Sequence, residues 1–201
     1  VQIGEQLWMA ENLKVTHYRD GSEIPHIISN NEWTAQNGGA YCYNQLLNDQ
    51  ELYGNIYNWY AVDDSRSLCM EGWHVPSINE WVILFNYLGG ESVAGGKMKE
   101  CTGGSCPESE YWNSPNTGAT NESGFTGLPG GTRNSSFNQG GGEYTLHMNN
   151  GYFWTTASGP TREYQSMPPT SWYRELSNEH SGINRQQYTT PGGLSVRCLK
   201  D

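Results

Sequence analysis

Five cysteines are the residues of this chain best suited to covalent chemistry. Cys101 and Cys106 flank the turn-forming tetrapeptide TGGS, and we expect them to close a small disulfide loop rather than stand as free thiols. Cys69 and Cys198 lie far apart, and joining them would tie the chain end to its middle, a stabilisation of about 4 to 5 kcal/mol in the chain-entropy model. Cys42 is then left over, as a buried apolar residue or a free thiol. No C-x-x-C pair occurs, which disfavours a zinc knuckle, and the cysteine usage indicates an exported protein.

Beyond these thiols, the chain offers few residues suited to catalysis or to metal binding. A nucleophilic cysteine needs an adjacent base, and no histidine is recognisably placed beside Cys42, Cys101 or Cys106. The five histidines show no i, i+4 spacing of the kind that binds zinc on a helix. His74 is expected to be a core residue with a satisfied hydrogen bond. We therefore predict no catalytic residues, no metal site and no required cofactor.

A long polar segment near the end of the chain carries the residue types of a binding surface. Residues 175–190 are rich in Ser, Asn, Gln, Thr and Tyr, which supply adaptable hydrogen bonds and amphipathic contact area, as antibody loops do. The segment stands before residues 194–198, LSVRC, which are typical of a short strand ending in a cysteine. Binding often resides on loops that a rigid scaffold holds. We therefore predict a binding surface here, the alternative for each single residue being simple solvation.

Composition and charge exclude several classes of partner. The 201 residues fit one domain, residues 1–201, with 35% hydrophobic and 16% charged residues. The formal net charge is −10 with only 11 Lys and Arg, which opposes nucleic-acid binding because a phosphate backbone needs a basic face. No apolar run approaches the roughly 20 residues of a membrane span, so we predict no direct membrane insertion. The chain opens without a signal-peptide pattern, and we expect a trimmed chain whose preceding sequence can carry a lipid anchor.

The binding segment needs a scaffold, and the chain offers one clear helix for it. Ser77 and Glu80 have the spacing of a capping box, and Trp81, Leu84, Phe85 and Leu88 follow the i, i+3, i+4, i+7 pattern before two glycines. This pattern predicts a helix with Trp81 in the core. A second, short helix is predicted near residues 56–62.

The rest of the chain is predicted to consist of loops and short strands. Residues 89–142 are rich in Gly, Ser, Asn and Thr and show no regular period, so we predict long ordered loops there. A strand followed by a turn is expected at QLWMAENL, and short strands are expected at GYFWTTA, TSWYREL and LSVRCL. An early pair of helices, a long loop region and terminal strands are typical of an α+β fold with a small mixed or antiparallel sheet.

Six motifs in the same order resemble the Fibrobacter succinogenes major paralogous domain family: IGEQLWMAENLKV, YGNIYNWYAV, CMEGWHVPSINEW, LGGESVAGGKMKE, NSPNTGATNESGFTGLPGG and GLSVRCLKD. The resemblance covers nearly the whole chain. It implies a C-type lectin-like fold akin to formylglycine-generating enzymes, with two helices on a small twisted, mostly antiparallel sheet and with long ordered loops. It also implies neighbouring chain ends, a Cys69–Cys198 disulfide, and an exported or surface-anchored protein of Bacteroidetes and related bacteria.

Residues 172–198 also resemble the variable segment of proteins that diversity-generating retroelements mutate. The residues at the positions of the constant frame are Trp172, Arg174, Leu176, Ile183 and Arg185. The residues where variation would fall, and which we predict to bind ligand together with Tyr173, are Glu175, Ser177, Glu179, His180, Asn184, Gln186, Gln187, Tyr188, Thr189 and Thr190. Tyr188 is expected to contribute most, because tyrosines are common interface anchors. The departures are Leu194 where the frame has Phe and the lack of Asn repeats; the alternative is an ordinary paralogue whose terminal loop has drifted.

The predicted function is therefore recognition of a protein or glycan ligand on a cell or phage surface, and two other functions compete with it. A calcium-dependent carbohydrate-binding adhesin would carry Glu-Pro-Asn or Gln-Pro-Asp with Trp-Asn-Asp, and neither is present. Asp63 and Asp64 are adjacent acids that could join a calcium site, so a structural calcium ion in the long loops stays open. A formylglycine-generating type of oxidase needs a reactive cysteine pair, for which Cys101 and Cys106, or Cys42, are the candidates.

Overall fold

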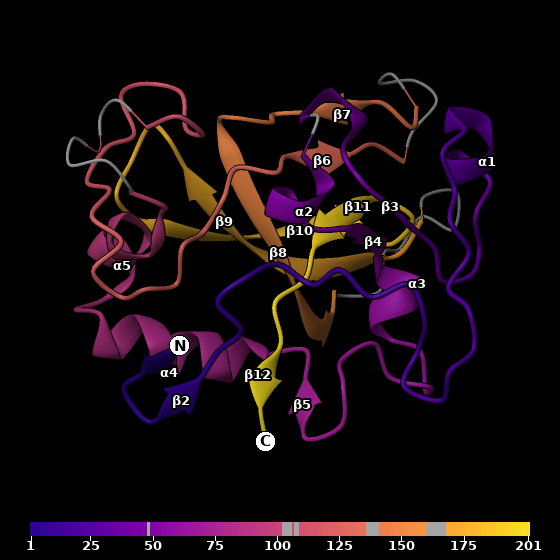
Figure 1. Ribbon diagram of the computed structural model, residues 1–201, viewed down its shortest axis with the longest axis horizontal. Helices are drawn as coiled ribbons and strands as arrows, with labels where there is room; N and C mark the ends of the chain where they lie inside the picture. Colours follow the sequence, from indigo (N-terminus) through magenta and orange to yellow (C-terminus); the bar gives the residue numbers. More distant parts are fainter. Residues whose placement is uncertain (48, 102–105, 107–108, 136–140, 160–167) are drawn as a thin grey trace.

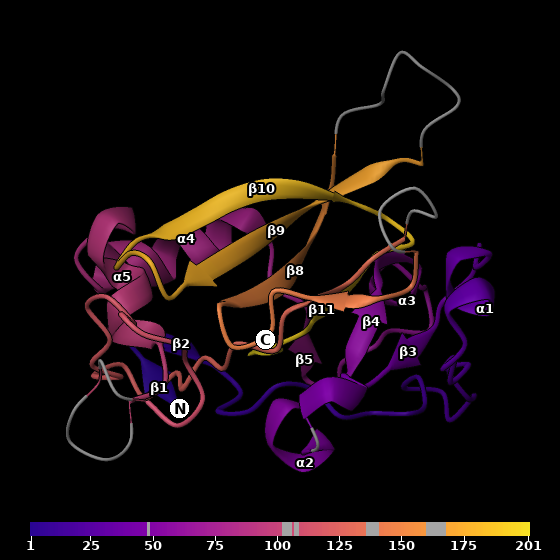
Figure 2. The ribbon, with the colours of Figure 1, turned by 90° about the horizontal axis from the view of Figure 1, so that it is seen from above.

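Three consecutive antiparallel strands near the end of the chain form the longest part of the sheet (Figures 1 and 2). The computed structural model describes residues 1–47, 49–101, 106, 109–135, 141–159 and 168–201. In these residues an eight-stranded sheet follows the path β10-β9-β8-β11-β4-β3, with β6 and β7 attached beside β11. Its strands are β3 (Tyr41–Cys42), β4 (Ile56–Asn58), β6 (Thr132–Arg133), β7 (Tyr144–Thr145), β8 (Asn150–Ser158), β9 (Thr170–Ser177), β10 (Ile183–Thr189) and β11 (Gly193–Ser195).

Two short ribbons complete the strands of the described residues. β1 (Gln2–Ile3) pairs with β2 (Gln6–Leu7), and β5 (Trp73–His74) pairs with β12 (Leu199–Lys200). All pairings between these described strands are antiparallel except that of β11 with β8. The fold is therefore mixed α+β and mostly β, with a largely antiparallel sheet as predicted, but the sheet is larger than the small one expected.

Two helices, α4 and α5, cover one face of the long strands (Figure 1). The five described α-helices are α1 (Asn30–Thr34), α2 (Gln50–Tyr53), α3 (Trp59–Val62), α4 (Ile78–Tyr87) and α5 (Glu91–Met98), and η1 (Gln45–Leu47) is a 3-10 turn. The predicted capping box opens α4, since the Ser77 hydroxyl accepts from the Glu80 N–H and the Glu80 carboxylate accepts from the Ser77 N–H. Trp81 is fully buried. The prediction of this helix and of its core face is confirmed.

The prediction of a helix at residues 56–62 is wrong for its first half. Ile56–Asn58 is the strand β4, which pairs with β3 on one side and β11 on the other. Only Trp59–Val62 is helical, and the Asn58 side chain caps it by accepting from the Ala61 N–H. The pattern of a short aromatic run is compatible with a helix or a strand. Pairing with β3 and β11 makes residues 56–58 a strand.

The prediction of long ordered loops over residues 89–142 is wrong for residues 91–98, which form α5, and for residues 132–133, which form β6. The glycines that argued against a helix are the reason that α5 fits. A Cβ on Gly95 would lie 2.1 Å from the Gly182 carbonyl oxygen, and one on Gly96 would lie 2.2 Å from that of Gly118. The backbone of α5 therefore touches two loops directly, and this packing outweighs the low helix propensity of glycine.

The closing segment differs from the single strand expected at its sequence. β11 ends at Ser195 and β12 begins at Leu199, so residues 196–198 pass between two sheets. They run beside the opening segment instead: the Met9 N–H donates to the Cys198 carbonyl at 3.0 Å and the Leu13 N–H to the Val196 carbonyl at 2.9 Å. Trp8 and Leu199 form a β-bridge. The expected adjacency of the opening and closing segments is confirmed.

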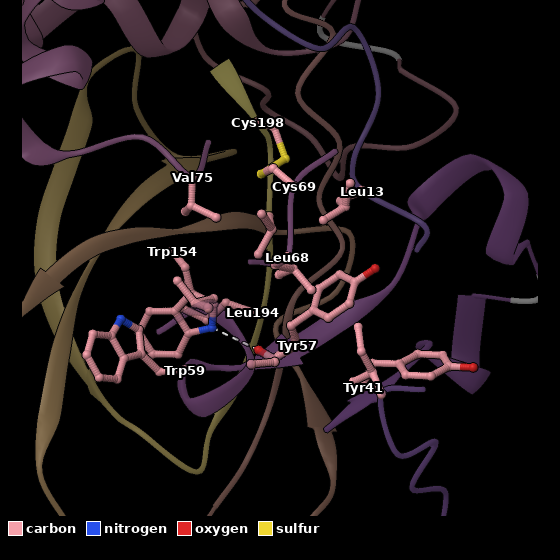
Figure 3. Packing of buried hydrophobic residues seen from close by; sticks show 14 of the residues in the cluster. Leu13, Tyr41, Tyr57, Trp59, Leu68, Cys69, Val75, Trp154, Leu194 and Cys198 are labelled. Atoms are coloured by element: carbon pink, nitrogen blue, oxygen red, sulfur yellow. Dashed lines mark hydrogen bonds between the residues drawn. A yellow bond between two sulfur atoms is a disulfide. The ribbon is translucent and has the colours of Figure 1, made fainter. Parts of the chain in front are cut away.

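Both expected disulfides are present. Cys69–Cys198 spans 129 residues and lies inside the core among Leu68, Val75 and Leu194 (Figure 3). There the Trp154 indole N–H donates to the Tyr57 carbonyl at 2.8 Å (Figure 3). Cys101–Cys106 closes a loop whose four intervening residues lie outside the described part. Among the described helices, none is long and apolar enough to cross a bilayer.

The long disulfide is expected to contribute far more stability than the short one. Closing a loop of 129 residues removes unfolded-chain entropy worth about 5 kcal/mol, whereas a loop of five residues gives about 2 kcal/mol. The double variant Cys69→Ala/Cys198→Ala should therefore lose more free energy of unfolding in urea than the matched control Cys101→Ala/Cys106→Ala. Equal losses, or no loss in the first variant, would contradict the role of the long disulfide.

Candidate functional site

The hairpin of β9 and β10 places the predicted binding residues on two opposite faces. Successive strand residues alternate in side-chain direction, and the register sets Glu175 opposite Asn184, Tyr173 opposite Gln186 and Ser171 opposite Tyr188. β8 continues the same face, because Tyr152 is opposite Glu175. We call this side the polar face; its members are Asn150, Tyr152, Tyr173, Glu175, Ser177, Asn184, Gln186 and Tyr188.

The opposite side of the hairpin faces the helices and holds all five residues of the expected constant frame. This helix-side face consists of Trp172, Arg174, Leu176, Ile183, Arg185, Gln187 and Thr189. Leu176 and Ile183 are buried in the cluster of α4 and α5 side chains. The buried Arg174 guanidinium lies 4.8 Å above the Phe85 ring and 3.4 Å from the Glu91 carboxylate. These contacts anchor the hairpin to the helices.

The outer end of the helix-side face is more open. The exposed Arg185 guanidinium lies 4.7 Å above the half-buried Trp172 ring. Two predicted binding residues, Gln187 and Thr189, point to this side and not to the polar face. The Gln187 side-chain amide oxygen accepts from the Thr170 hydroxyl at 2.9 Å, and the Thr189 hydroxyl bonds to that of Ser135. The structure therefore splits the predicted set between two surfaces.

Glu175 is the centre of the polar face. Its carboxylate accepts from the Asn150 amide at 2.7 Å, the Asn184 amide at 3.3 Å and the Gln186 amide at 3.4 Å. The Asn184 amide also lies 3.2 Å from the His180 Nε2. Within the described part of the chain no Lys or Arg forms an ion pair with Glu175. A carboxylate held by neutral side chains can take further donors from a ligand, since it has about four acceptor positions.

A layer of aromatic rings supports this network from below. Tyr152 and Tyr173 are buried and meet edge to face at 5.4 Å, and Tyr173 meets Tyr188 in the same way at 6.2 Å. Burial, with the nearby charge of Glu175, raises the pKa of Tyr152 and of Tyr173 well above the ordinary value. The half-buried Tyr188 donates its hydroxyl to Asn134 at 2.8 Å. The tyrosines thus form the floor of the site more than its exposed contacts.

A buried lysine that the sequence-based prediction missed holds the tip of the hairpin. Lys99, fully buried at the end of α5, donates from Nζ to the carbonyls of Ser177 at 2.7 Å, Thr117 at 2.8 Å and His180 at 3.2 Å. Burial lowers its pKa to about 8. The sequence carries no signal that separates it from Lys97, which lies two residues earlier and is partly exposed.

The remaining predicted binding residues lie at the two ends of the hairpin. Glu179 is exposed and His180 is half-buried. Ser177 is buried, and its hydroxyl accepts from the Glu179 N–H at 3.1 Å. Thr190 is buried at the other end, where its carbonyl accepts from the Trp59 N–H at 2.9 Å. Ser177 and Thr190 therefore hold the two ends of the hairpin in place.

The residues considered for catalysis or metal binding lie apart from one another in the structure. Cys42 is a free, buried thiol, and burial raises its pKa, which disfavours the reactive thiolate. His74 is not the core residue expected: its ring is partly exposed and bonds to Asp201 at 2.5 Å and Glu80 at 2.7 Å. Its hydrogen bonds are satisfied, as predicted.

Asp64, one of the two acids considered for calcium, pairs with Arg66 at 2.7 Å. The described residues contain no group of three or more His, Cys, Asp or Glu side chains that could hold a metal ion.

Comparison with known proteins agrees with the resemblance seen in the sequence. The family model of the Fibrobacter succinogenes major domain matches residues 1–200. No curated protein and no solved structure matches the chain.

Replacing Lys99 by methionine should destabilise the protein. Lys99→Met removes the donor from three carbonyls, of which that of Ser177 is buried, and this should lower the free energy of unfolding at pH 7 by about 2 to 3 kcal/mol. The pH dependence has a defined sign. The folded-state pKa of Lys99 is about 8, below its ordinary value of 10.5, so the unfolded chain binds more protons between these values. The stability of the unaltered protein relative to Lys99→Met should therefore rise with pH across this window.

The matched control is Lys97→Met, since Lys97 lies two residues away and forms a partly exposed ion pair with Glu122 at 2.8 Å. It should change stability by less than about 1 kcal/mol. Urea unfolding of the three proteins at several pH values makes the comparison. An equal effect of both substitutions would show that Lys99 does not hold the hairpin tip.

Proposed function

The chain belongs to the Fibrobacter succinogenes major domain family, and we propose that it is a non-enzymatic recognition domain, exported or displayed on the cell surface, which binds a protein or glycan ligand through the polar face. The observation that carries this proposal is the Glu175 carboxylate, which three amides hold at the centre of a partly exposed face. Carboxylate and amide groups on a rigid sheet offer both acceptors and donors to a polar ligand.

The division between the two faces of the hairpin supports this proposal. Arg174, Leu176 and Ile183 anchor it to α4 and α5 from one side. Asn184 and Gln186 lie on the other side and contact mainly polar groups. Substitutions at partly exposed positions usually change stability by only about 0.5 kcal/mol, so this face can vary while the anchor stays the same.

The same division supports diversification by a retroelement as the origin of the segment. All five frame residues point to the helix-side face, and five of the ten positions where variation would fall point to the polar face. A mechanism that changes chosen codons and preserves others would need such an alternation, because side chains of one strand face alternate ways.

A C-type lectin-like arrangement is the fold that we propose within the α+β class. Its support is the closing segment beside the opening one, the disulfide that fastens it, and the two main helices on one face of the sheet. We propose no required cofactor, and a structural calcium ion would be an addition to the disulfides rather than a ligand-binding centre.

The polar face is tested by a matched pair of triple variants. The labelled protein is applied to a glycan array and to intact bacterial cells, with and without EDTA. Glu175→Gln/Asn184→Ala/Gln186→Ala should reduce binding about tenfold or more, as expected for several lost polar contacts. The control Glu32→Gln/Gln36→Ala/Asn37→Ala makes the same residue changes in α1 and in the residues that follow it, and it should bind normally. Equal loss in both variants would contradict the proposal, and loss with EDTA would favour a calcium-dependent adhesin.

The retroelement origin is tested in the neighbouring DNA. We expect a reverse-transcriptase gene and a near-copy of the codons for residues 172–198 that differs only at adenines. The differences should fall on codons of the polar face and spare Arg174, Leu176 and Ile183, because these residues anchor the hairpin. Absence of both elements would leave an ordinary paralogue.

A further inference from the structure

β10 is the outermost strand of the sheet and has a neighbour on one side only. It stands at the end of the strand path, next to β9, and in Figure 2 it crosses the top of the sheet as the outer ribbon. A strand in this position presents a row of N–H and C=O groups that belong to no ladder.

The hydrogen-bond pattern identifies the outward backbone groups. The Thr190 N–H donates to the Pro169 carbonyl at 2.9 Å, so this pair is a hydrogen-bonded one. Such pairs recur every second residue, and the register therefore places Tyr188, Gln186 and Asn184 in the same class. The residues between them direct their N–H and C=O groups away from β9.

The other edge of β9 gives the same result independently. The Asn178 N–H donates to the Asn149 carbonyl and the Gly159 N–H donates to the Thr170 carbonyl, both towards β8. The even-numbered residues of β9 thus direct their backbone N–H and C=O groups towards β8, and the odd-numbered residues direct theirs towards β10. Arg185 and Gln187 consequently hold their N–H and C=O groups towards the outside of the sheet.

The free part of this edge is short. At one end Gly95 of α5 approaches Gly182, and at the other the Thr189 carbonyl accepts from the Gly192 N–H at 2.8 Å. Among the described residues, no hydrogen-bond partner is found for the outward backbone groups of Arg185 and Gln187. The Arg185 and Gln186 side chains are exposed. The backbones of Arg185 and Gln187 thus offer two N–H donors and two C=O acceptors. The two residues lie about 7 Å apart along the strand.

We propose that an extended peptide segment of a partner protein binds here as an added strand beside β10. Alternating donors and acceptors at strand spacing match another peptide backbone. The alternate side chains of the peptide would lie beside Gln186 on the polar face and beside Arg185 and Trp172 on the helix-side face. A second copy of this chain is a poor occupant, because each carries a net charge of −10 and the two would repel.

This inference rests on the proposed function, since it names a peptide strand as the ligand of the same hairpin. The probe is a displayed library of random seven-residue peptides, selected on the unaltered protein. Binding of the selected peptides is then measured by fluorescence polarisation to the protein, to Gln187→Pro and to Gln187→Ala. Proline removes the outward N–H of Gln187 and no ladder bond, and edge strands tolerate proline at such positions. Gln187→Pro should weaken binding about tenfold or more, and Gln187→Ala should weaken it far less.

A second arm leaves the protein unchanged. N-methylation of the selected peptide should abolish binding at alternate residues only, because only every second N–H of an added strand faces β10. This arm decides the question even if Gln187→Pro fails to fold, which circular dichroism would reveal.

Three outcomes would overturn the inference: no enriched peptide, binding that tolerates N-methylation at every position, or a concentration-dependent dimer that Gln187→Pro abolishes, which would identify a second copy as the occupant. If the peptides depend on Glu175, Asn184 and Gln186 side chains but tolerate N-methylation, the edge inference fails and the polar face stands. If neither set of changes matters, both proposals fail.

Discussion

The buried charge of Arg197 is the constraint on which the closing of the fold depends. Its guanidinium is 1% exposed, donates to the Asn12 side chain at 2.6 Å and to the Phe125 carbonyl, and lies 4.1 Å above the Phe125 ring. A buried charge is costly unless hydrogen bonds compensate it, and here the two terminal nitrogens of the guanidinium make those bonds while Nε has no partner among the described residues. The opening segment, the loop at Phe125 and residues 196–198 must therefore meet in one arrangement, and the adjacent Cys198 makes it covalent through Cys69.

The candidate site takes its rigidity from this closure and from Lys99. The chain leaves β10, turns at Thr190 against α3 and enters β11, which leads directly to Arg197. At the opposite end the Lys99 ammonium binds two carbonyls of the hairpin tip. Both ends of the hairpin are therefore fixed by groups outside it. The side chains of Glu175, Asn184 and Gln186 are consequently not needed to hold the hairpin together, whereas Tyr152 and Tyr173 pack in the core.

The helix held by contacts between residues close in sequence was predicted correctly, and two elements held by contacts between distant residues were not. α4 was predictable because its capping box and its apolar period involve residues three or four positions apart. α5 was not, because Gly95 and Gly96 lower helix propensity locally and are explained only by contacts with the distant Gly182 and Gly118. β4 was mistaken for a helix because its buried strand state depends on β3 and β11, which come from other parts of the chain.

The amino-acid sequence by itself determined the family, the two cysteine pairs, the main helix and the polar character of residues 175–190, since these follow from motif order and residue type. Tertiary structure alone decided how that segment is divided. Pairing of β10 with β9 sent Glu175, Asn184 and Gln186 to one face and Gln187 and Thr189 to the other. It also left the backbone of Arg185 and Gln187 directed outward. The physical reason is strand register: a shift by one residue would exchange the two faces, and the register here depends on Leu176 and Ile183 packing against helices more than 70 residues away in the chain.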